Sequence, residues 1–291
     1  MDESGATLDW VIEEPSAIAL NNAGVSRDLF TVGMNVRVAG PVSERREGRM
    51  VGWHWLLPPG LEVIMVPNRS DQPRWADTAA GSDVVADLFS ATGPVPDDGK
   101  GIFRVWSWEP VSPFWMMRDA DQYPLTEAAM EAQSEWDADD PVDNLTLRCE
   151  PPGMPATMGD PHPIEFVDLG DTIEIRMEEF DQVRTIHMDS TQNPSEVPRS
   201  PLGYSTGRWE GDTLIVETNR LNARYFNRHG IPQSEDARIE ERFTMDVASG
   251  KLNYVLTVTD PVNLTVPFVE RLVWNWNENS RRQRYDCQVF E

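Results

Sequence analysis

The strongest constraint on how this chain folds is a series of short alternating segments that follow Pro163. The segment 172–178, TIEIRME, alternates apolar and polar residues, which is typical of a β-strand with two different faces. We expect strands at 164–168, 172–178, 183–188, 204–209, 213–218, 237–245, 252–259 and 267–276, with a last short one near 284–290. Gly-Asp and Ser-Gly turns separate several of them, as in antiparallel hairpins. Sequential antiparallel strands in this number commonly remove their exposed edges by curling into a barrel.

By composition the chain divides into three parts. Residues 1–67 contain short alternating segments and are predicted to form a small antiparallel β unit. Residues 68–100 are rich in Asp, Pro, Gly and Ser and are predicted to be a linker. Residues 101–291 hold the barrel, with one helix near 126–137 that Thr126 can cap. We therefore expect a mainly β protein whose C-terminal antiparallel meander forms a barrel-like, lipocalin-like domain.

The chain is strongly acidic, with 25 Lys and Arg against 49 Asp and Glu and a formal net charge of -24. Such a chain lacks the basic surface that attracts nucleic acid or anionic membranes, so neither is an expected partner. No apolar run approaches the roughly 20 residues that a membrane-spanning helix needs. Residues 1–15 lack the basic and apolar regions of a signal peptide, which agrees with a cytoplasmic protein or with one whose leader has been removed.

The two cysteines and four histidines do not show metal-ligand spacing. Cys149 and Cys287 lie far apart and outside any CxxC pattern, so a structural zinc site is not expected. They can form one disulfide that ties the end of the chain to its middle, or remain two buried thiols. Neither GxGxxG nor a P-loop occurs, so no cofactor is expected. Ser205 in GYSTG matches the nucleophile elbow only superficially, because a hairpin strand and not a helix follows it.

Titratable residues on several predicted strands are positioned to line a concave face. Glu178 and Glu179 occupy a carboxylate-rich corner, and the strand that follows carries Arg184 and His187. A carboxylate inside an apolar barrel has a raised pKa, which suits it to general acid–base catalysis near neutrality. The candidate catalytic residues are Glu178, Glu179, Arg184, His187, Glu217, Glu240 and Arg242.

A structural role is the alternative for each of these residues. Glu178 can pair across strands with Arg184, and Glu240 with Arg238 or Arg242. A single strand histidine such as His187 is more often a wall residue than a catalyst. Most of the tryptophans are expected in the core, with some lining an apolar ligand cavity. Two long loops, 190–203 and 219–236, are candidates for lids or binding loops.

Four segments of the chain resemble a known group of proteins. They are GYSTGRWEGDTLIVET (203–218), EEFDQVRTIHMD (178–189), PQSEDARIEERFT (232–244) and LTVTDP (256–261). They resemble a widespread family of exported, β-rich bacterial proteins. Residues 10–40 are similar to the latter part of a small exported β domain and lack its opening strands. The resemblance implies a periplasmic or secreted protein, and no activity or catalytic residue is carried over from it.

These observations predict an enzyme that acts on a small, largely apolar organic molecule held in the barrel. The chemistry would be cofactor-independent acid–base catalysis of the lyase, hydratase, isomerase or cyclase type. A non-catalytic small-molecule-binding protein of the bacterial envelope is the first alternative. A structural or interaction module, with the barrel filled by side chains, is the second.

Overall fold

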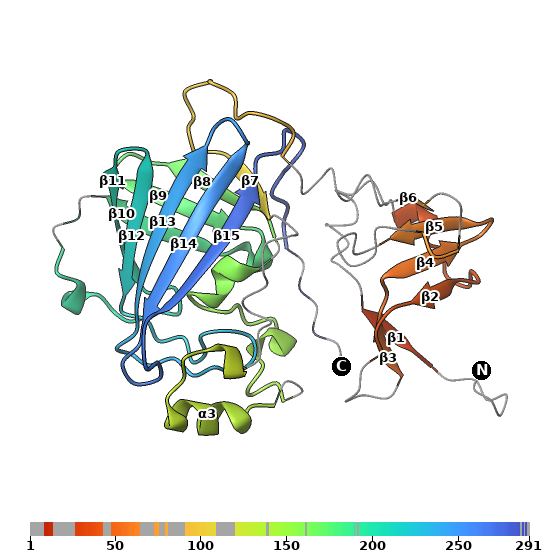
Figure 1. The fold of residues 1–291 in the computed structure, drawn as a ribbon, viewed down its shortest axis with the longest axis horizontal. Coiled ribbons are helices and arrows are strands. Elements are labelled where there is room, and N and C mark those ends of the chain that lie inside the picture. Colours follow the sequence, from red (N-terminus) through yellow and green to blue (C-terminus); the bar gives the residue numbers. More distant parts are fainter. Residues whose placement is uncertain are drawn as a thin grey trace. The chain divides into compact units, whose positions relative to one another are not determined.

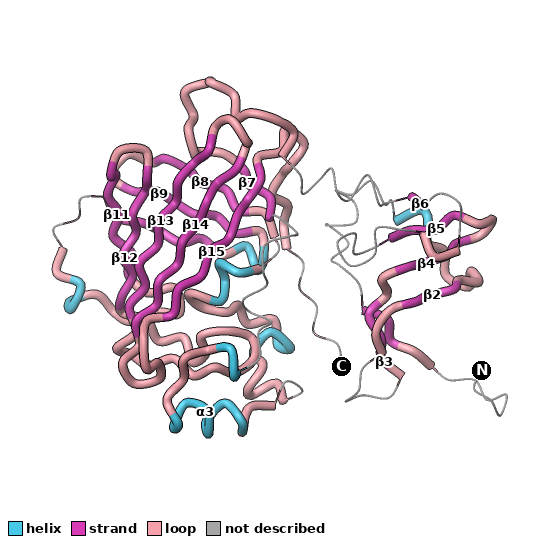
Figure 2. Tube along the Cα trace, viewed as in Figure 1, coloured by secondary structure: helices cyan, strands magenta, loops and turns pink. Residues whose placement is uncertain are grey.

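The chain forms two compact units, Met1–Ser90 and Ala91–Glu291 (Figure 1). The computed structural model describes residues 9–13, 27–42, 48–64, 73–75, 79–80, 91–108, 120–137, 140–160, 162–188, 190, 192–285, 287 and 289. Much of the predicted linker lies outside the described residues, and residues 91–100 belong to the second unit. Strands dominate both units, as Figure 2 shows, which confirms the predicted mainly β fold.

Nine strands of the second unit form a closed barrel. They are β7 (Val105–Trp108), β8 (Ile164–Asp168), β9 (Thr172–Met177), β10 (Val183–Met188), β11 (Tyr204–Glu210), β12 (Thr213–Asn219), β13 (Arg238–Asp246), β14 (Lys251–Thr259) and β15 (Phe268–Asn275). The eight strands predicted after Pro163 are all present, with ends that agree to within about one residue. The described residues near 284–290 form no strand, so the last predicted strand is not found there.

One joint of the barrel differs from the predicted antiparallel meander. β10 and β11 pair in parallel, whereas the other eight neighbouring pairs are antiparallel. A closed ring with an odd number of strands cannot alternate direction all the way round, so at least one parallel pair is unavoidable. The loop 190–203, which follows β10, supplies the long crossover that a parallel pair requires.

The barrel interior is filled with apolar side chains. Trp106, Phe166, Phe243, Tyr254 and Trp274 are almost completely buried, and the last three pack ring against ring. Phe166 meets Phe243 edge to face, with 5.2 Å between ring centroids. Along β8, β9, β13 and β14 buried residues alternate with more exposed ones, so the period-two pattern that predicted these strands also produces much of the core.

A buried ion pair lies within this core. Arg184 on β10 donates two hydrogen bonds to the carboxylate of Glu241 on β13, one of them 2.9 Å long. Its Nε also donates to Ser205 at 3.0 Å and its Nη2 to Thr218 at 2.7 Å, and the Tyr254 hydroxyl donates to Glu241 at 2.9 Å. Burial disfavours the charge on Arg184, but the attraction of Glu241 outweighs it and raises the pKa of Arg184. All five side chains are satisfied and buried, which makes this network structural.

One end of the barrel, called the α3 end below, is covered by the long connections between strands. The helix α3 (Glu127–Ser134) lies there, below the barrel in the view of Figure 1. Thr126 caps the helix as predicted, accepting a hydrogen bond from the Ala129 amide at 3.3 Å. The short 3₁₀ helices of this unit are η4 (Ala120–Gln122), η5 (Leu145–Arg148), η6 (Ala156–Gly159), η7 (Glu179–Asp181) and η8 (Pro194–Glu196).

Asp260 joins two of the connections at the α3 end. Its carboxylate accepts hydrogen bonds from the backbone and hydroxyl of Ser234, at 2.8 and 2.6 Å, and from the Asn263 side chain at 2.9 Å. Burial alone would raise the pKa of Asp260, but these hydrogen bonds outweigh burial and leave the pKa below its ordinary value. The carboxylate therefore fixes the loop after β12 against the loop after β14.

The first unit contains two small sheets. The strands are β1 (Val11–Glu13), β2 (Arg37–Ala39), β3 (Arg49–Val51), β4 (His54–Leu57), β5 (Leu61–Ile64) and β6 (Ala79–Ala80), with the 3₁₀ helix η1 (Arg27–Leu29). β1 pairs with β3, and β2-β4-β5-β6 form the other sheet. Within it, Glu62 is fully buried and accepts hydrogen bonds from the backbone amides of Arg74 and Trp75, at 2.6 and 2.7 Å, and pairs with His54 at 2.8 Å. These contacts attach residues 73–75 to the sheet.

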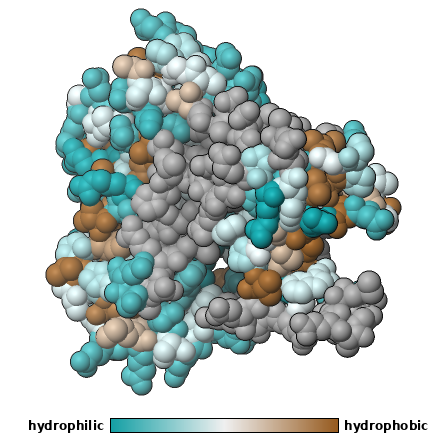
Figure 3. Space-filling view, turned by 45° about the vertical axis from the view of Figure 1, so that its right-hand side comes forward, coloured by the Kyte–Doolittle hydropathy of each residue, from teal (hydrophilic) through white to brown (hydrophobic). Residues whose placement is uncertain are grey.

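The described surface is largely hydrophilic. On the face drawn in Figure 3, hydrophilic residues cover much of the coloured surface, and apolar residues lie among them singly or in small groups. This agrees with the formal net charge of -24.

The two adjacent glutamates of β13 give a direct test of the interior network. Glu241 faces the interior and Glu240 faces outward, where its side chain is 49% exposed. We expect Glu241→Ala to lower the free energy of unfolding by about 3–5 kcal/mol, because Arg184 would be left as a buried, unpaired charge. Glu240→Ala is the matched control and should leave the urea midpoint nearly unchanged. Equal effects of the two substitutions would contradict the assignment of faces.

Candidate functional site: a carboxylate corner and a pocket at the α3 end

The connection between β9 and β10 forms a sharp corner at the α3 end of the barrel. Phe180 and Asp181 both have left-handed backbone conformations, with φ of 56° and 50°. Such conformations are uncommon for residues other than glycine and cluster at functional sites. The turn points Glu178 and Glu179 inward, where they are only 1% and 4% exposed. Two adjacent acidic residues are thus buried in a strained turn.

Arg228 neutralises part of this acidic corner. It belongs to the loop after β12, and its Nη2 lies 2.8 Å from Oδ2 of Asp160 and also contacts Oε1 of Glu179. The other oxygen of Glu179, Oε2, is buried without a hydrogen-bond partner among the described residues. Burial raises the pKa of Asp160, although the nearby Arg228 and His162 act to lower it. Two buried carboxyl groups therefore share one guanidinium, and one of them holds its proton more tightly than usual.

Glu178 is held on the other side of the corner. Its Oε1 lies 3.4 Å from Nδ1 of His162, and its Oε2 accepts a hydrogen bond of 2.8 Å from the Gln283 amide. The ring of Tyr285 packs edge-on against His162, with 5.7 Å between centroids. Burial raises the pKa of Tyr285, and the charges of Arg228 and Asp160 act on it in opposite directions. We define the carboxylate corner as Asp160, His162, Glu178, Glu179, Arg228 and Tyr285.

A pocket of about 170 Å³ lies next to the carboxylate corner. Its apolar lining includes Trp136, Pro152 and Ala223, and its polar lining includes Tyr225 and Arg228. The Tyr225 hydroxyl donates a hydrogen bond of 3.1 Å to Asp143, and burial together with this bond raises the pKa of Tyr225 to about 12. Arg228 is the residue shared by the pocket and the carboxylate corner, so a molecule in the pocket would lie beside a guanidinium that holds two acids.

The seven candidate residues predicted from the sequence fall into three places. Glu178 and Glu179 lie together in the carboxylate corner, whereas Arg184 belongs to the separate network inside the barrel. His187 lies on the outer face and stacks on Tyr204, with 4.8 Å between ring centroids. The expectation that all seven residues line one concave face is wrong, although Glu217 and Glu240 line a common pocket of about 270 Å³ on the barrel surface.

Glu217, Glu240 and Arg242 lie on the outer face of the barrel. Glu217 pairs with Arg208 at 2.7 Å. Arg242 lies 3.3 Å from Glu210 and 3.8 Å from Glu240 of its own strand, so the contact between Glu240 and Arg242 lies within β13 and not across strands as predicted. The three side chains are 41–56% exposed. The faces were misassigned because a shift of one residue along a strand moves a side chain to the other face. β12 obscures its faces further, since Leu214, Ile215 and Val216 are all buried.

The sequence did not single out Asp160, Arg228, Tyr285 or the pocket. These residues come from the segment before β8, the loop after β12 and the C-terminal tail, and no spacing pattern links them. The one useful indication was the length of the loop 219–236, which was predicted to be a lid or binding loop and which carries Arg228.

No family model, no curated protein and no solved structure matches the chain. Among the described residues, His, Cys, Asp and Glu form no group of three or more that could hold a metal ion. No helix in the described part of the chain is long and apolar enough to span a membrane.

The raised pKa of Asp160 predicts a characteristic pH dependence of stability. The folded protein retains the proton of Asp160 to higher pH than the unfolded chain does. The contribution of this proton to stability is therefore complete below the ordinary pKa of 3.8 and is lost as the pH rises through the folded pKa. The free energy of unfolding of the wild type, measured relative to Asp160→Asn, should fall as the pH rises from 3.8 to the folded pKa. Urea unfolding at a series of pH values measures it.

Asp260→Asn is the matched control, because the pKa of Asp260 is lowered. Its contribution is present above the ordinary pKa and is lost as the pH falls through the folded pKa, so the corresponding difference should rise with pH. If the two differences have the same sign of slope, the environment assigned to Asp160 is incorrect.

Proposed function

We propose that this protein is an enzyme that acts on a small, largely apolar organic molecule by cofactor-independent acid–base catalysis at the α3 end. The observation that carries the proposal is the position of Arg228, which lines the pocket and binds both Asp160 and Glu179. A positioned acid with a raised pKa beside a cation is an arrangement that proton-transfer enzymes use.

The residues of the site have distinct proposed roles. The apolar wall formed by Trp136 and its neighbours binds the hydrocarbon part of the substrate, and Arg228 holds an oxygen atom of the substrate. Asp160 gives or takes the proton, because burial raises its pKa, which is the direction of shift that suits a carboxyl group to acid–base catalysis. Glu178 and Glu179 keep Arg228 and His162 in place. Proton transfer next to an oxygen-bearing carbon is the step shared by isomerases, lyases and hydratases.

The proposed substrate site differs from the one expected from the sequence, which placed the molecule inside the barrel. Aromatic rings fill the interior around Tyr254 and Trp274, and the pocket lies outside it, against the connections at the α3 end. Barrel proteins commonly place ligand groups on loops that a rigid sheet supports. The carboxylate corner would gain its rigidity from β9 and β10 in this way.

A non-catalytic binding protein is the second candidate. The burial of Asp160, which is 5% exposed, favours this candidate. A molecule in the pocket contacts Arg228, which lines it, whereas Asp160 does not line the pocket. A location of the protein outside the cytoplasm stays a prediction in either case, and the Cys149–Cys287 disulfide is compatible with it.

A two-stage experiment tests the proposal. Soaking crystals in a library of small apolar molecules that carry a carbonyl or hydroxyl group identifies molecules that occupy the pocket. Each is then incubated with the protein in deuterated water, and mass spectrometry measures deuterium incorporation into the small molecule. We expect incorporation, and we expect Asp160→Asn to slow it by about 100-fold or more while occupancy of the pocket persists.

Glu174→Gln is the matched control, because Glu174 pairs with Arg176 on the barrel surface, remote from the chemistry. It should leave incorporation unchanged. Molecules that occupy the pocket without any incorporation would favour the non-catalytic binding protein. Incorporation that survives Asp160→Asn would remove Asp160 from the mechanism, and a pocket that binds none of the library would contradict both candidates.

A further inference from the structure

The segment 277–285, together with Cys287, is here called the tail strap and runs along the outside of the barrel. It leaves β15 at the end opposite α3 and returns toward the α3 end across β7 and β8. Ser280 shares a hydrogen bond with Ser107 of β7, whose side chain faces outward but is only 3% exposed. Arg282 lies 3.5 Å from Glu165 of β8. The tail strap therefore covers the outer face of these two strands.

At the α3 end the tail strap lies against the carboxylate corner. The backbone N–H of Gln283 donates a hydrogen bond of 2.8 Å to the carboxylate of Glu178, and the backbone N–H of Tyr285 donates one of 3.2 Å to Asp181. The Tyr285 ring contacts Phe180, with 4.8 Å between centroids, as well as His162. Glu178 is only 1% exposed beneath these contacts. The tail strap thus helps to separate the buried acids from solvent.

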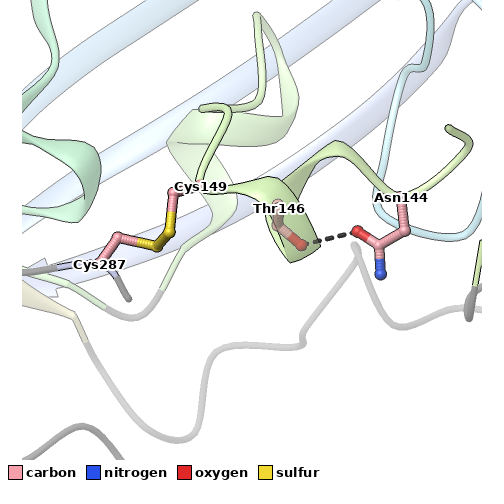
Figure 4. Close-up of a disulfide and its surroundings, with 4 residues drawn as sticks. All are labelled: Asn144, Thr146, Cys149 and Cys287. Atoms are coloured by element: carbon pink, nitrogen blue, oxygen red, sulfur yellow. Dashed lines mark hydrogen bonds between the residues drawn. A yellow bond between two sulfur atoms is a disulfide. The ribbon is translucent and has the colours of Figure 1, made fainter. Parts of the chain in front are cut away.

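A disulfide fastens the end of the tail strap. Cys287 is bonded to Cys149, which resolves the two alternatives left open by the sequence in favour of a disulfide (Figure 4). Cys149 directly follows the short helix η5, and Thr146 of this helix, which hydrogen-bonds to Asn144 in Figure 4, lines the pocket. The bond therefore connects the cover of the carboxylate corner to the wall of the pocket.

We propose that the Cys149–Cys287 disulfide is a redox latch that controls access to the carboxylate corner. A dithiol reductant would supply two electrons and two protons. The S–S bond would break, two cysteine thiols would form, and the reductant would become a disulfide. The tail strap would then leave the corner and expose Glu178 and the groups behind it. This inference rests on the proposed function and names a regulation of that same site.

The contacts of the tail strap explain why the latch controls it. Between β15 and the disulfide the segment is fixed at both ends, so it can lift only by breaking contacts along its whole length. Once the bond to Cys149 is broken, the contacts of the tail strap can open one after another, starting at Cys287. The ion pairs of Arg282, at 3.4 and 3.5 Å, are long and partly exposed and contribute little. The barrel keeps its own closed set of strand pairs and does not need the latch.

Hydrogen exchange measured by mass spectrometry tests the latch on the full chain, oxidised and after treatment with a dithiol. We expect exchange of the tail strap, including the amides of Gln283 and Tyr285, to rise by at least about tenfold on reduction, while β12, β13 and β14 keep their protection. Labelling of Glu178 with a carbodiimide and an amine should rise in parallel. The variant Cys149→Ser with Cys287→Ser should reproduce the reduced state.

Ser280→Ala is the matched control, because it removes a contact of the tail strap and leaves the disulfide intact. It should keep the tail strap protected. Unchanged exchange after reduction, or loss of protection by β12, β13 and β14 together with the tail strap, would overturn the proposal. So would an opening of the same size in oxidised Ser280→Ala.

These outcomes are separate from those that test the proposed chemistry. A tail strap that opens on reduction while no small molecule takes up deuterium would leave the latch standing and refute the acid–base function. If deuterium uptake occurs in a protein whose tail strap stays closed in both redox states, the function stands and the latch is refuted.

Discussion

The closure of nine strands into one ring is the constraint on which the rest of the second unit depends. An odd ring needs a parallel joint, and here it lies between β10 and β11, bridged by the crossover 190–203. All other neighbouring pairs are antiparallel, so apart from this crossover successive connections alternate between the two ends. The tight turns after β8, β11 and β13 lie at one end, and the longer connections after β7, β12 and β14 lie at the α3 end. The irregular segments that can form a site are therefore gathered at one end.

Two arginines of this unit show how the same kind of ion pair serves different purposes. Arg184 meets one carboxylate, and its three nitrogens all donate hydrogen bonds to buried partners. Charge and hydrogen bonding are balanced there, and nothing remains for chemistry. Arg228 meets two buried carboxyl groups, and burial raises the pKa of Asp160 even though Arg228 acts to lower it. A buried acid with a raised pKa beside a charged partner distinguishes this candidate site from the structural pair of Arg184.

The strands were predictable because most of them have one buried and one exposed face. The alternation in β9, β13 and β14 is visible in the sequence and recurs in the burial of the folded chain. The choice of inward face was not predictable where the pattern is ambiguous. Glu240 and Glu241 are adjacent and chemically identical, and only the neighbours of β13 in the barrel decide which of them meets Arg184.

The candidate site was predictable only where its residues are close in the sequence. Glu178 and Glu179 were found because they stand together at a corner between two strands. Asp160, Arg228 and Tyr285 come from three separate connections, and no local pattern links residues that meet only after the barrel has closed.

The sequence by itself determined the strand positions, the capped helix and the acidic surface, because these depend on neighbours within a few residues. The tertiary structure alone decided the parallel joint, the disulfide, the inward face of each strand and the partners of Arg228. Those features depend on which distant segments come into contact, and that is set by the closure of the ring.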